Sequence, residues 1–141
     1  MAYEAKLFAT YGKFTFVKID DISEIIDHHA GYEEFWRTNE KVKSQIEPIG
    51  AVCTQIYERF VEAGKADLID GDLAKLLIAG ILDNTITLKS KTTTERDLKA
   101  YSGLKERGGL SEDFRNEYFL ACEKEQMKDL KAAILGDMKA E

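Results

Sequence analysis

Hydrophobic and polar residues form short runs over the first third of the chain, a pattern typical of strands. Lys13 to Asp20 (KFTFVKID) is rich in aromatic and β-branched residues and is predicted to be a strand. Glu24 to Asp27 is a short apolar run that predicts a buried strand, and Lys41 to Glu47 alternates polar and apolar residues as a half-exposed strand does. Tyr3 to Thr10 precedes them as a short predicted helix. Gly31 to Asn39 is a polar connection whose aromatic residues are interpreted as packing anchors.

From residue 49 onward the apolar positions recur every three or four residues, which predicts amphipathic helices. The first helix shows this spacing at Ile49, Val52, Cys53, Ile56 and Phe60. The next helix, Leu73 to Leu82, is apolar nearly all round and is therefore predicted to be buried, with an acidic cap in Asp70 to Asp72. Thr92 to Glu95 matches a capping box and is predicted to start a third helix. Ser111 is predicted to cap a long amphipathic stretch that runs to Met138.

The order of strands first and helices later predicts an α/β layer structure with an incomplete sheet. A chain of 141 residues with 44% hydrophobic and 33% charged residues fits one globular domain. The net charge of −6 argues against a general nucleic-acid or membrane-surface binder. No apolar run approaches the roughly 18 residues of a membrane span. Cys53 and Cys122 form no C-x-x-C pair, so they are interpreted as free thiols of a cytoplasmic protein.

The chain's only two histidines follow an acid at the end of the second predicted strand, as Asp27-His28-His29. Imidazole is a common ligand of divalent metals, and an adjoining carboxylate can ligate as well or fix the tautomer of the ring. Neighbouring residues of a strand point to opposite faces, so two adjacent histidines share a site only where the strand gives way to a loop. The alternative interpretation is a surface acid beside two solvated histidines.

A second polar group, Asp83-Asn84-Thr85, follows the predicted buried helix and needs hydrogen-bond partners there. Basic residues follow it at Lys89, Lys91 and Arg96. They are candidate phosphate contacts, although basic residues around a helix start are also commonly solvated.

Four stretches of the chain together resemble a known family. These are Ile26-Asp27-His28-His29, the turn Ile46 to Ala51 (IEPIGA), Ala79 to Thr85 (AGILDNT) and Lys89 to Asp97 (KSKTTTERD). In this order and at these intervals they resemble the motifs of the DHH phosphoesterase superfamily and are most similar to those of manganese-dependent (family II) inorganic pyrophosphatases. The resemblance covers roughly Ile19 to Leu104. It implies a partial parallel-sheet DHH-type α/β domain with helices packed on the sheet.

The resemblance also implies roles for single residues. His28 matches a metal ligand, His29 matches the catalytic histidine that contacts the substrate phosphate, and Asp27 supports the pair as a further ligand. Asn84 stands at the position of a metal-binding aspartate, and Asp83 would serve instead if the helix end shifted by one residue. The implied cofactor is Mn²⁺, with Mg²⁺ or Co²⁺ as alternatives. Lys89 and Arg96 are the candidate phosphate-binding residues.

Two features of the family pattern are missing from residues 1–141. These are the first motif, with a histidine and aspartates that hold one metal, and the second domain, which supplies basic residues to the phosphates. We therefore expect a single, incomplete DHH-like domain that is inactive on its own. In a two-metal enzyme of this type, a cluster of carboxylates and imidazoles polarises a phosphoryl group and activates water.

The sequence leaves two main function hypotheses. The first is a metal-dependent phosphoesterase or inorganic pyrophosphatase that acts on a phosphorylated small molecule such as pyrophosphate. The second is a degenerate, non-catalytic DHH-like binding or assembly module. We expect no membrane partner, no nucleic acid beyond a short oligonucleotide, and self-association or a partner chain. An unrelated α/β domain with accidental triplets is a third possibility.

Overall fold

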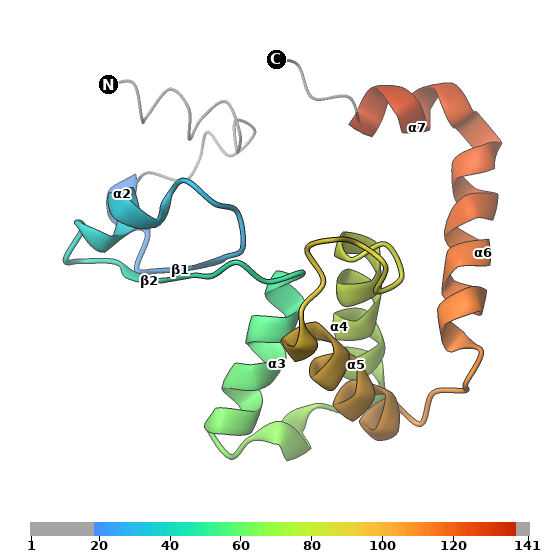
Figure 1. Ribbon diagram of the computed structural model, residues 1–141, viewed down its shortest axis with the longest axis horizontal. Helices are drawn as coiled ribbons and strands as arrows, with labels where there is room; N and C mark the ends of the chain where they lie inside the picture. The colour runs from blue at the N-terminus through green and yellow to red at the C-terminus, as the bar shows by residue number, and fades with distance from the viewer. Residues whose placement is uncertain (1–18, 138–141) are drawn as a thin grey trace. The chain divides into compact units, whose positions relative to one another are not determined.

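Residues 19–137 are described in the structure, a computed structural model (Figure 1). They form two compact units, one ending at Pro48 and the other beginning at Ile49. The predicted helix Tyr3 to Thr10 and nearly all of the predicted strand Lys13 to Asp20 lie outside the described residues. The last two residues of that predicted strand belong to the 3-10 helix η1 (Ile19–Asp21).

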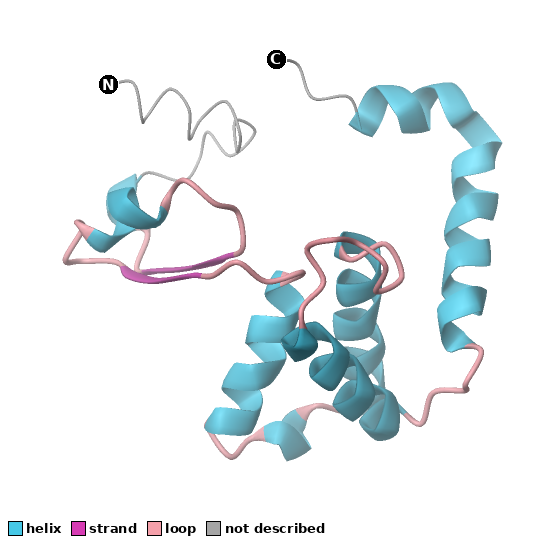
Figure 2. Ribbon diagram, in the orientation of Figure 1, coloured by secondary structure: helices cyan, strands magenta, loops and turns pink. Residues whose placement is uncertain are grey.

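The described part of the first unit, residues 19–48, contains two parallel strands, shown in magenta in Figure 2. They are β1 (Glu24–Asp27) and β2 (Lys43–Ile46), in a register that sets Asp27 opposite Ile46. Parallel strands require a crossover connection, and here it carries the short helix α2 (Glu33–Arg37), which packs on β2. The predictions of strands at Glu24 to Asp27 and Lys41 to Glu47 are confirmed within two residues, but β1 is not fully buried, since only its last residue, Asp27, is.

The segment predicted as a polar connection is partly helical, because α2 lies inside it. Trp36 explains the difference: its side chain is only 3% exposed and meets the ring of Phe35 edge to face, with ring centroids 5.0 Å apart. One helical turn brings this large apolar side chain inward, which the polar sequence around it did not indicate. The predicted role of these aromatic residues as packing anchors agrees with this arrangement.

The second unit is helical. Its core lies between α3 (Val52–Glu62), α4 (Gly71–Asn84) and α5 (Glu95–Gly108), which pack on one another. The fully buried apolar side chains are those of Ala51, Ala74, Ile78, Ile81, Leu82 and Leu104. Asp70 caps α4 as predicted, because its carboxylate accepts a hydrogen bond from the Leu73 amide at 2.8 Å. The prediction that α4 is buried all round is wrong on one side, where Leu76 is 69% exposed.

Two glycines allow the three helices to approach closely. A Cβ at Gly80 on α4 would overlap the Sγ of Cys53 on α3, and a Cβ at Gly103 on α5 would overlap the hydroxyl of Tyr57. The side chain of Cys53 thus fills the space above Gly80, and that of Tyr57 fills the space above Gly103. This packing fixes the contacts of α3 with α4 and α5.

The C-terminal stretch forms three consecutive helical segments rather than one. They are α6 (Phe114–Gln126), the 3-10 helix η3 (Met127–Asp129) and α7 (Leu130–Asp137). The predicted cap at Ser111 is wrong: the residue before the helix is Asp113, and Ser111 contributes only its carbonyl, which accepts the Phe114 amide. Among residues 19–137, no helix is long and apolar enough to cross a membrane.

The described residues thus form a mixed α/β structure that is mostly helical and has a small parallel sheet. The predicted fold class is confirmed.

Candidate metal centre

The Asp27-His28-His29 group lies where β1 ends. Asp27 is the last residue of the strand and is 8% exposed, whereas His28 and His29 follow it outside the strand. Each of the three side chains offers one ligand atom, and these atoms lie within 4.8 Å of one another. The two adjacent imidazoles come together because the chain has left the strand before it reaches them.

Asp27 accepts several hydrogen bonds from the residues that follow it. Its Oδ1 lies 2.7 Å from Nδ1 of His29, and accepts the backbone amides of His28 at 2.7 Å and His29 at 3.3 Å. Burial raises the pKa of Asp27, but the hydrogen bonds from His29 and His28 outweigh burial and bring this pKa below its usual value. Asp27 is therefore a carboxylate at neutral pH.

A carboxylate and two imidazoles make a donor set that suits a divalent transition metal such as Mn²⁺ or Co²⁺. The Nδ1 of His29 already faces Asp27, so Nε2 is its nitrogen left to meet a metal or a phosphate oxygen. The rings of His28 and His29 meet edge to face, with centroids 4.5 Å apart. The side chain of His29 is 58% exposed, which leaves it accessible to a ligand from solvent.

The second candidate group lies at the end of α4. Asp83 and Asn84 are the last residues of the helix, and both are exposed. The Asn84 amide Nδ2 donates a hydrogen bond to the carbonyl of Gly80 at 3.0 Å, a bond that does not engage its Oδ1. This group and the Asp27 group lie in different compact units.

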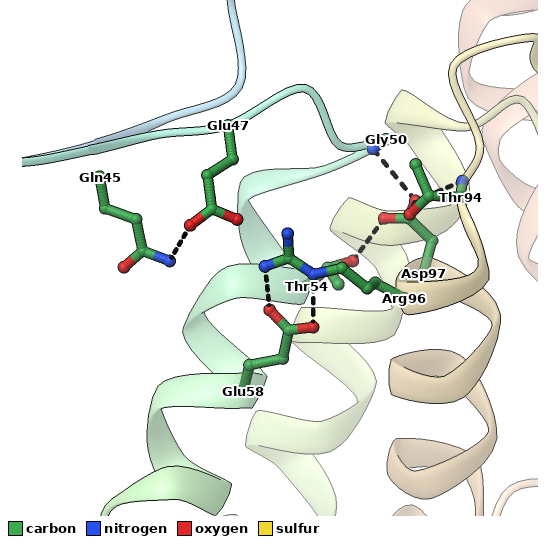
Figure 3. A network of polar contacts seen from close by, with 8 residues as sticks. All are labelled: Gln45, Glu47, Gly50, Thr54, Glu58, Thr94, Arg96 and Asp97. Atoms are coloured by element: carbon green, nitrogen blue, oxygen red, sulfur yellow. Dashed lines mark hydrogen bonds and ion pairs between the residues drawn. The ribbon is translucent and has the colours of Figure 1, made fainter. Parts of the chain in front are cut away.

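The two candidate phosphate-binding residues have different environments. Lys89 is exposed in the segment that follows α4. Arg96 lies in the first turn of α5, and its Nε and Nη2 donate to the two carboxylate oxygens of Glu58 on α3 at 2.8 and 2.5 Å (Figure 3). A bidentate pair of this kind fixes the guanidinium in position.

Two features around these residues were not predicted from the sequence. The first is a left-handed turn of three consecutive non-glycine residues, Ile86, Thr87 and Leu88, with φ of 47°, 58° and 64°. The second is the buried carboxylate of Asp97, which accepts a hydrogen bond from the Thr94 amide at 2.8 Å. The predicted capping box, Thr92 to Glu95, is therefore wrong: the observed box, Thr94 to Asp97, lies two residues further along the chain.

The shift in the capping box has a physical cause. Helix α5 starts at Glu95 after an extended Thr94, because the acid that caps it is the buried Asp97. Thr94-x-x-Asp97 is itself a capping pattern, and recognising it would have required knowing which of three consecutive threonines has the extended conformation.

The fold and the candidate centre together define a mixed α/β protein with a carboxylate–imidazole group at the end of a parallel strand. No family model matches the chain. The manganese-dependent inorganic pyrophosphatase of Methanocaldococcus jannaschii is 33% identical over 115 residues, which cover 72% of this chain and 36% of the relative. The cobalt-dependent inorganic pyrophosphatase of Clostridium perfringens is 31% identical over 120 residues, covering 84% of this chain and 21% of the relative.

A solved structure leads to the same family. A crystal structure of a family II inorganic pyrophosphatase from Methanococcus jannaschii matches with a TM-score of 0.55 and 32% identity, over 69% of this chain and 34% of that one. The chain is therefore related to the manganese-dependent, family II inorganic pyrophosphatases, as its motifs indicated. It spans between a fifth and about a third of the length of the relatives described.

Proposed function

We propose that this chain carries part of a metal-dependent centre that hydrolyses a phosphoanhydride or phosphodiester, with inorganic pyrophosphate as the substrate. In this proposal Asp27 and His28 bind Mn²⁺ or Co²⁺, and His29 contacts the substrate phosphate. Asp83 or Asn84 supplies a further ligand, and Lys89 and Arg96 contact phosphate. The observation that carries the proposal is the convergence of three ligand atoms within 4.8 Å at the end of β1.

The chemistry assigned to each group follows from its charge and its donors. A bound divalent cation polarises a phosphoryl group and lowers the pKa of a bound water. Asp27 holds the His29 ring through the contact between Oδ1 and Nδ1, so that the ring meets the phosphate in one orientation. Lys89, which is exposed, supplies positive charge to the phosphate oxygens.

Calorimetric titration of the full chain with Mn²⁺ tests the metal site. We expect affinity in the micromolar range that His28→Ala abolishes, with the same loss when Co²⁺ replaces Mn²⁺. The matched control is Asp72→Ala, which removes an acid that pairs with Lys75 on the surface of α4 and should leave Mn²⁺ affinity unchanged. Equal Mn²⁺ binding by wild type and His28→Ala would refute the assignment.

Turnover requires a separate measurement, since we propose that the chain alone binds metal without completing the two-metal site. Release of phosphate from pyrophosphate in the presence of Mn²⁺ should be absent or very slow for the isolated chain.

A second candidate function is the non-catalytic binding or assembly module, favoured by the uncharged Asn84 at the proposed ligand position. Tight Mn²⁺ binding by the Asp27 group would count against that candidate.

Self-association or binding to a partner chain also remains a prediction. It is supported by exposed apolar side chains along α6, η3 and α7, namely Leu120, Met127, Leu130, Ile134 and Leu135. Sedimentation equilibrium of the purified chain would show a dimer or larger species if the prediction holds, and a monomer at every concentration if it does not.

A cytoplasmic location stays a prediction as well, supported by two free cysteines.

A further inference from the structure

The carboxylate of Asp97 is fully buried and accepts four hydrogen bonds (Figure 3). The donors are the Gly50 amide at 3.0 Å, the Thr54 hydroxyl at 2.6 Å, and the amide and hydroxyl of Thr94 at 2.8 and 2.7 Å. Gly50 lies two residues before α3 and Thr54 lies in its first turn, whereas Thr94 immediately precedes α5. One acidic side chain thus joins the beginnings of two helices that are far apart in the sequence.

Space at this junction is as restricted as the hydrogen bonding. A Cβ added to Gly50 would lie 2.7 Å from Oδ2 of Asp97 and 2.7 Å from Cγ2 of Thr85, distances that Cβ atoms do not tolerate. Thr85 directly follows α4 and is itself fully buried. The start of α3, the end of α4 and the start of α5 therefore meet around Gly50, Thr85 and Asp97.

Thr85 holds the first part of the loop between α4 and α5. Its hydroxyl donates to the carbonyl of Ile81 at 2.6 Å and accepts the Leu88 amide at 3.0 Å. Its own carbonyl accepts the amides of Lys89 at 2.9 Å and Ser90 at 2.8 Å. These bonds close the left-handed turn over residues 86–88, a conformation that non-glycine residues adopt only when their surroundings impose it.

The loop of residues 85–94 is thus fixed at both ends, by Thr85 where it begins and by Asp97 where it ends. It carries Lys89, which is exposed, and it starts directly after Asp83 and Asn84. We propose that Asp97 is a positioning residue that keeps this loop in one conformation and so holds Lys89 ready for a phosphate group. Only the contact between Lys89 and phosphate rests on the function proposed above.

Asp97 has no access to a ligand, because its side chain is fully buried. Any effect of its replacement on binding must therefore pass through the backbone of the loop or through the start of α3. This separates Asp97 from Lys89, whose replacement would remove the contacting group itself.

Amide hydrogen exchange of the full chain, followed by NMR, tests the ordering of the loop without any ligand. In Asp97→Asn the carboxamide nitrogen faces groups that are themselves donors, so the amides of Thr94, Lys89 and Ser90 should exchange about tenfold faster or more. Thr54→Val removes the one donor to Asp97 that lies on α3, so it should also speed exchange of the Thr94 amide. The matched control Thr54→Ser keeps the hydroxyl and should leave this exchange unchanged. Unchanged exchange in Asp97→Asn and Thr54→Val would overturn the proposal.

Titration with inorganic pyrophosphate in the presence of Mn²⁺ tests the consequence for binding. We expect Asp97→Asn to bind pyrophosphate about tenfold more weakly than wild type, and Thr54→Val to show an intermediate loss of affinity. If Asp97→Asn does not fold, Thr54→Val tests the positioning role in its place. Binding by Asp97→Asn as tight as wild type would overturn the positioning role. If wild type itself fails to bind pyrophosphate, the proposed function fails, and the exchange experiment still decides whether Asp97 orders the loop.

Discussion

Nδ1 of His29 lies 2.7 Å from Oδ1 of Asp27, and the same oxygen accepts the backbone amides of both histidines. A single carboxylate oxygen therefore sets the direction of the chain after β1 and the orientation of one imidazole ring. With Nδ1 acting as the donor, Nε2 of His29 is the nitrogen that faces a ligand. Under the proposed function, the metal affinity of the group would depend on Asp27 both as a ligand and as a support for His29.

Asp27→Ala should weaken Mn²⁺ binding by at least about tenfold to a hundredfold, because it removes a proposed ligand of the metal together with the carboxylate that orients its histidine neighbours. Asp27→Asn keeps an oxygen that can accept from Nδ1, so its loss should be smaller. Isothermal titration calorimetry measures both values. Glu40→Ala, which removes an exposed acid of the same unit, is the control and should bind as wild type does. Equal affinity for Asp27→Ala and Glu40→Ala would show that Asp27 plays no part.

Variants of the pair at the end of α4 decide which residue serves as the further ligand. If Asn84 occupies the ligand position, Asn84→Asp should strengthen Mn²⁺ binding because a carboxylate replaces a neutral amide. Asp83→Asn should then have little effect. The opposite result, a loss with Asp83→Asn and no gain with Asn84→Asp, would show that Asp83 is the ligand. Both variants change only one exposed side chain, so a fluorescence-detected Mn²⁺ competition assay can compare them directly with wild type.

Ile86→Gly should stabilise the protein even though glycine usually destabilises. Ile86 has a φ of 47° and is 64% exposed, so the substitution relieves a left-handed conformation at little cost in burial. We expect a gain of about 0.5–1 kcal/mol in the free energy of unfolding, measured by urea denaturation. Leu76→Gly is the matched control, since Leu76 is also exposed but helical, and it should lose about 1 kcal/mol. A loss of similar size in both variants would contradict the left-handed turn.

Gly80→Ala should destabilise the second unit, although alanine is the better helix former by about 1 kcal/mol. The added methyl group would overlap the Sγ of Cys53, and such overpacking costs about 1–3 kcal/mol. The double variant Gly80→Ala/Cys53→Ala removes the overlap and should recover part of that loss. Thermal unfolding of the four proteins in this double-mutant cycle gives the coupling between the two positions. Additive effects would mean that the two side chains do not meet.

Patterns with a regular period were predicted well from the sequence. A short apolar run indicated β1, alternation indicated β2, and apolar spacing indicated the helices α3, α4 and α5. Each of these patterns can be found in the local sequence alone. The convergence of Asp27, His28 and His29 was also predicted, because three consecutive residues at a strand end cannot lie far apart. What these residues bind stays a prediction.

Features that depend on contacts between distant residues were not predicted. The start of α5 depends on Gly50 and Thr54, whose hydrogen bonds bury Asp97 and make Thr94 the capping residue. The left-handed turn depends on Thr85, since no glycine marks residues 86–88. Helix α2 depends on the burial of Trp36. In each case a tertiary contact overrides a local preference, and single-sequence patterns do not contain that information.

The stability of the chain should fall in acid through Asp97, and the sign follows from its surroundings. Burial raises the pKa of Asp97, but the hydrogen bonds from Thr54, Thr94 and Gly50 outweigh burial and lower this pKa below its usual value. A carboxyl with a lower pKa in the folded than in the unfolded protein stabilises the fold at pH values above its unfolded pKa of about 3.9. That stabilisation is lost as the pH falls through the pKa of Asp97 in the folded protein.

Urea denaturation between about pH 7 and pH 3 should therefore show a steeper loss of stability for wild type than for Asp97→Asn. Asp27, whose pKa is also lowered, contributes to both curves, so the difference between them reports on Asp97. Parallel curves would show that the four hydrogen bonds to Asp97 do not favour its charged form.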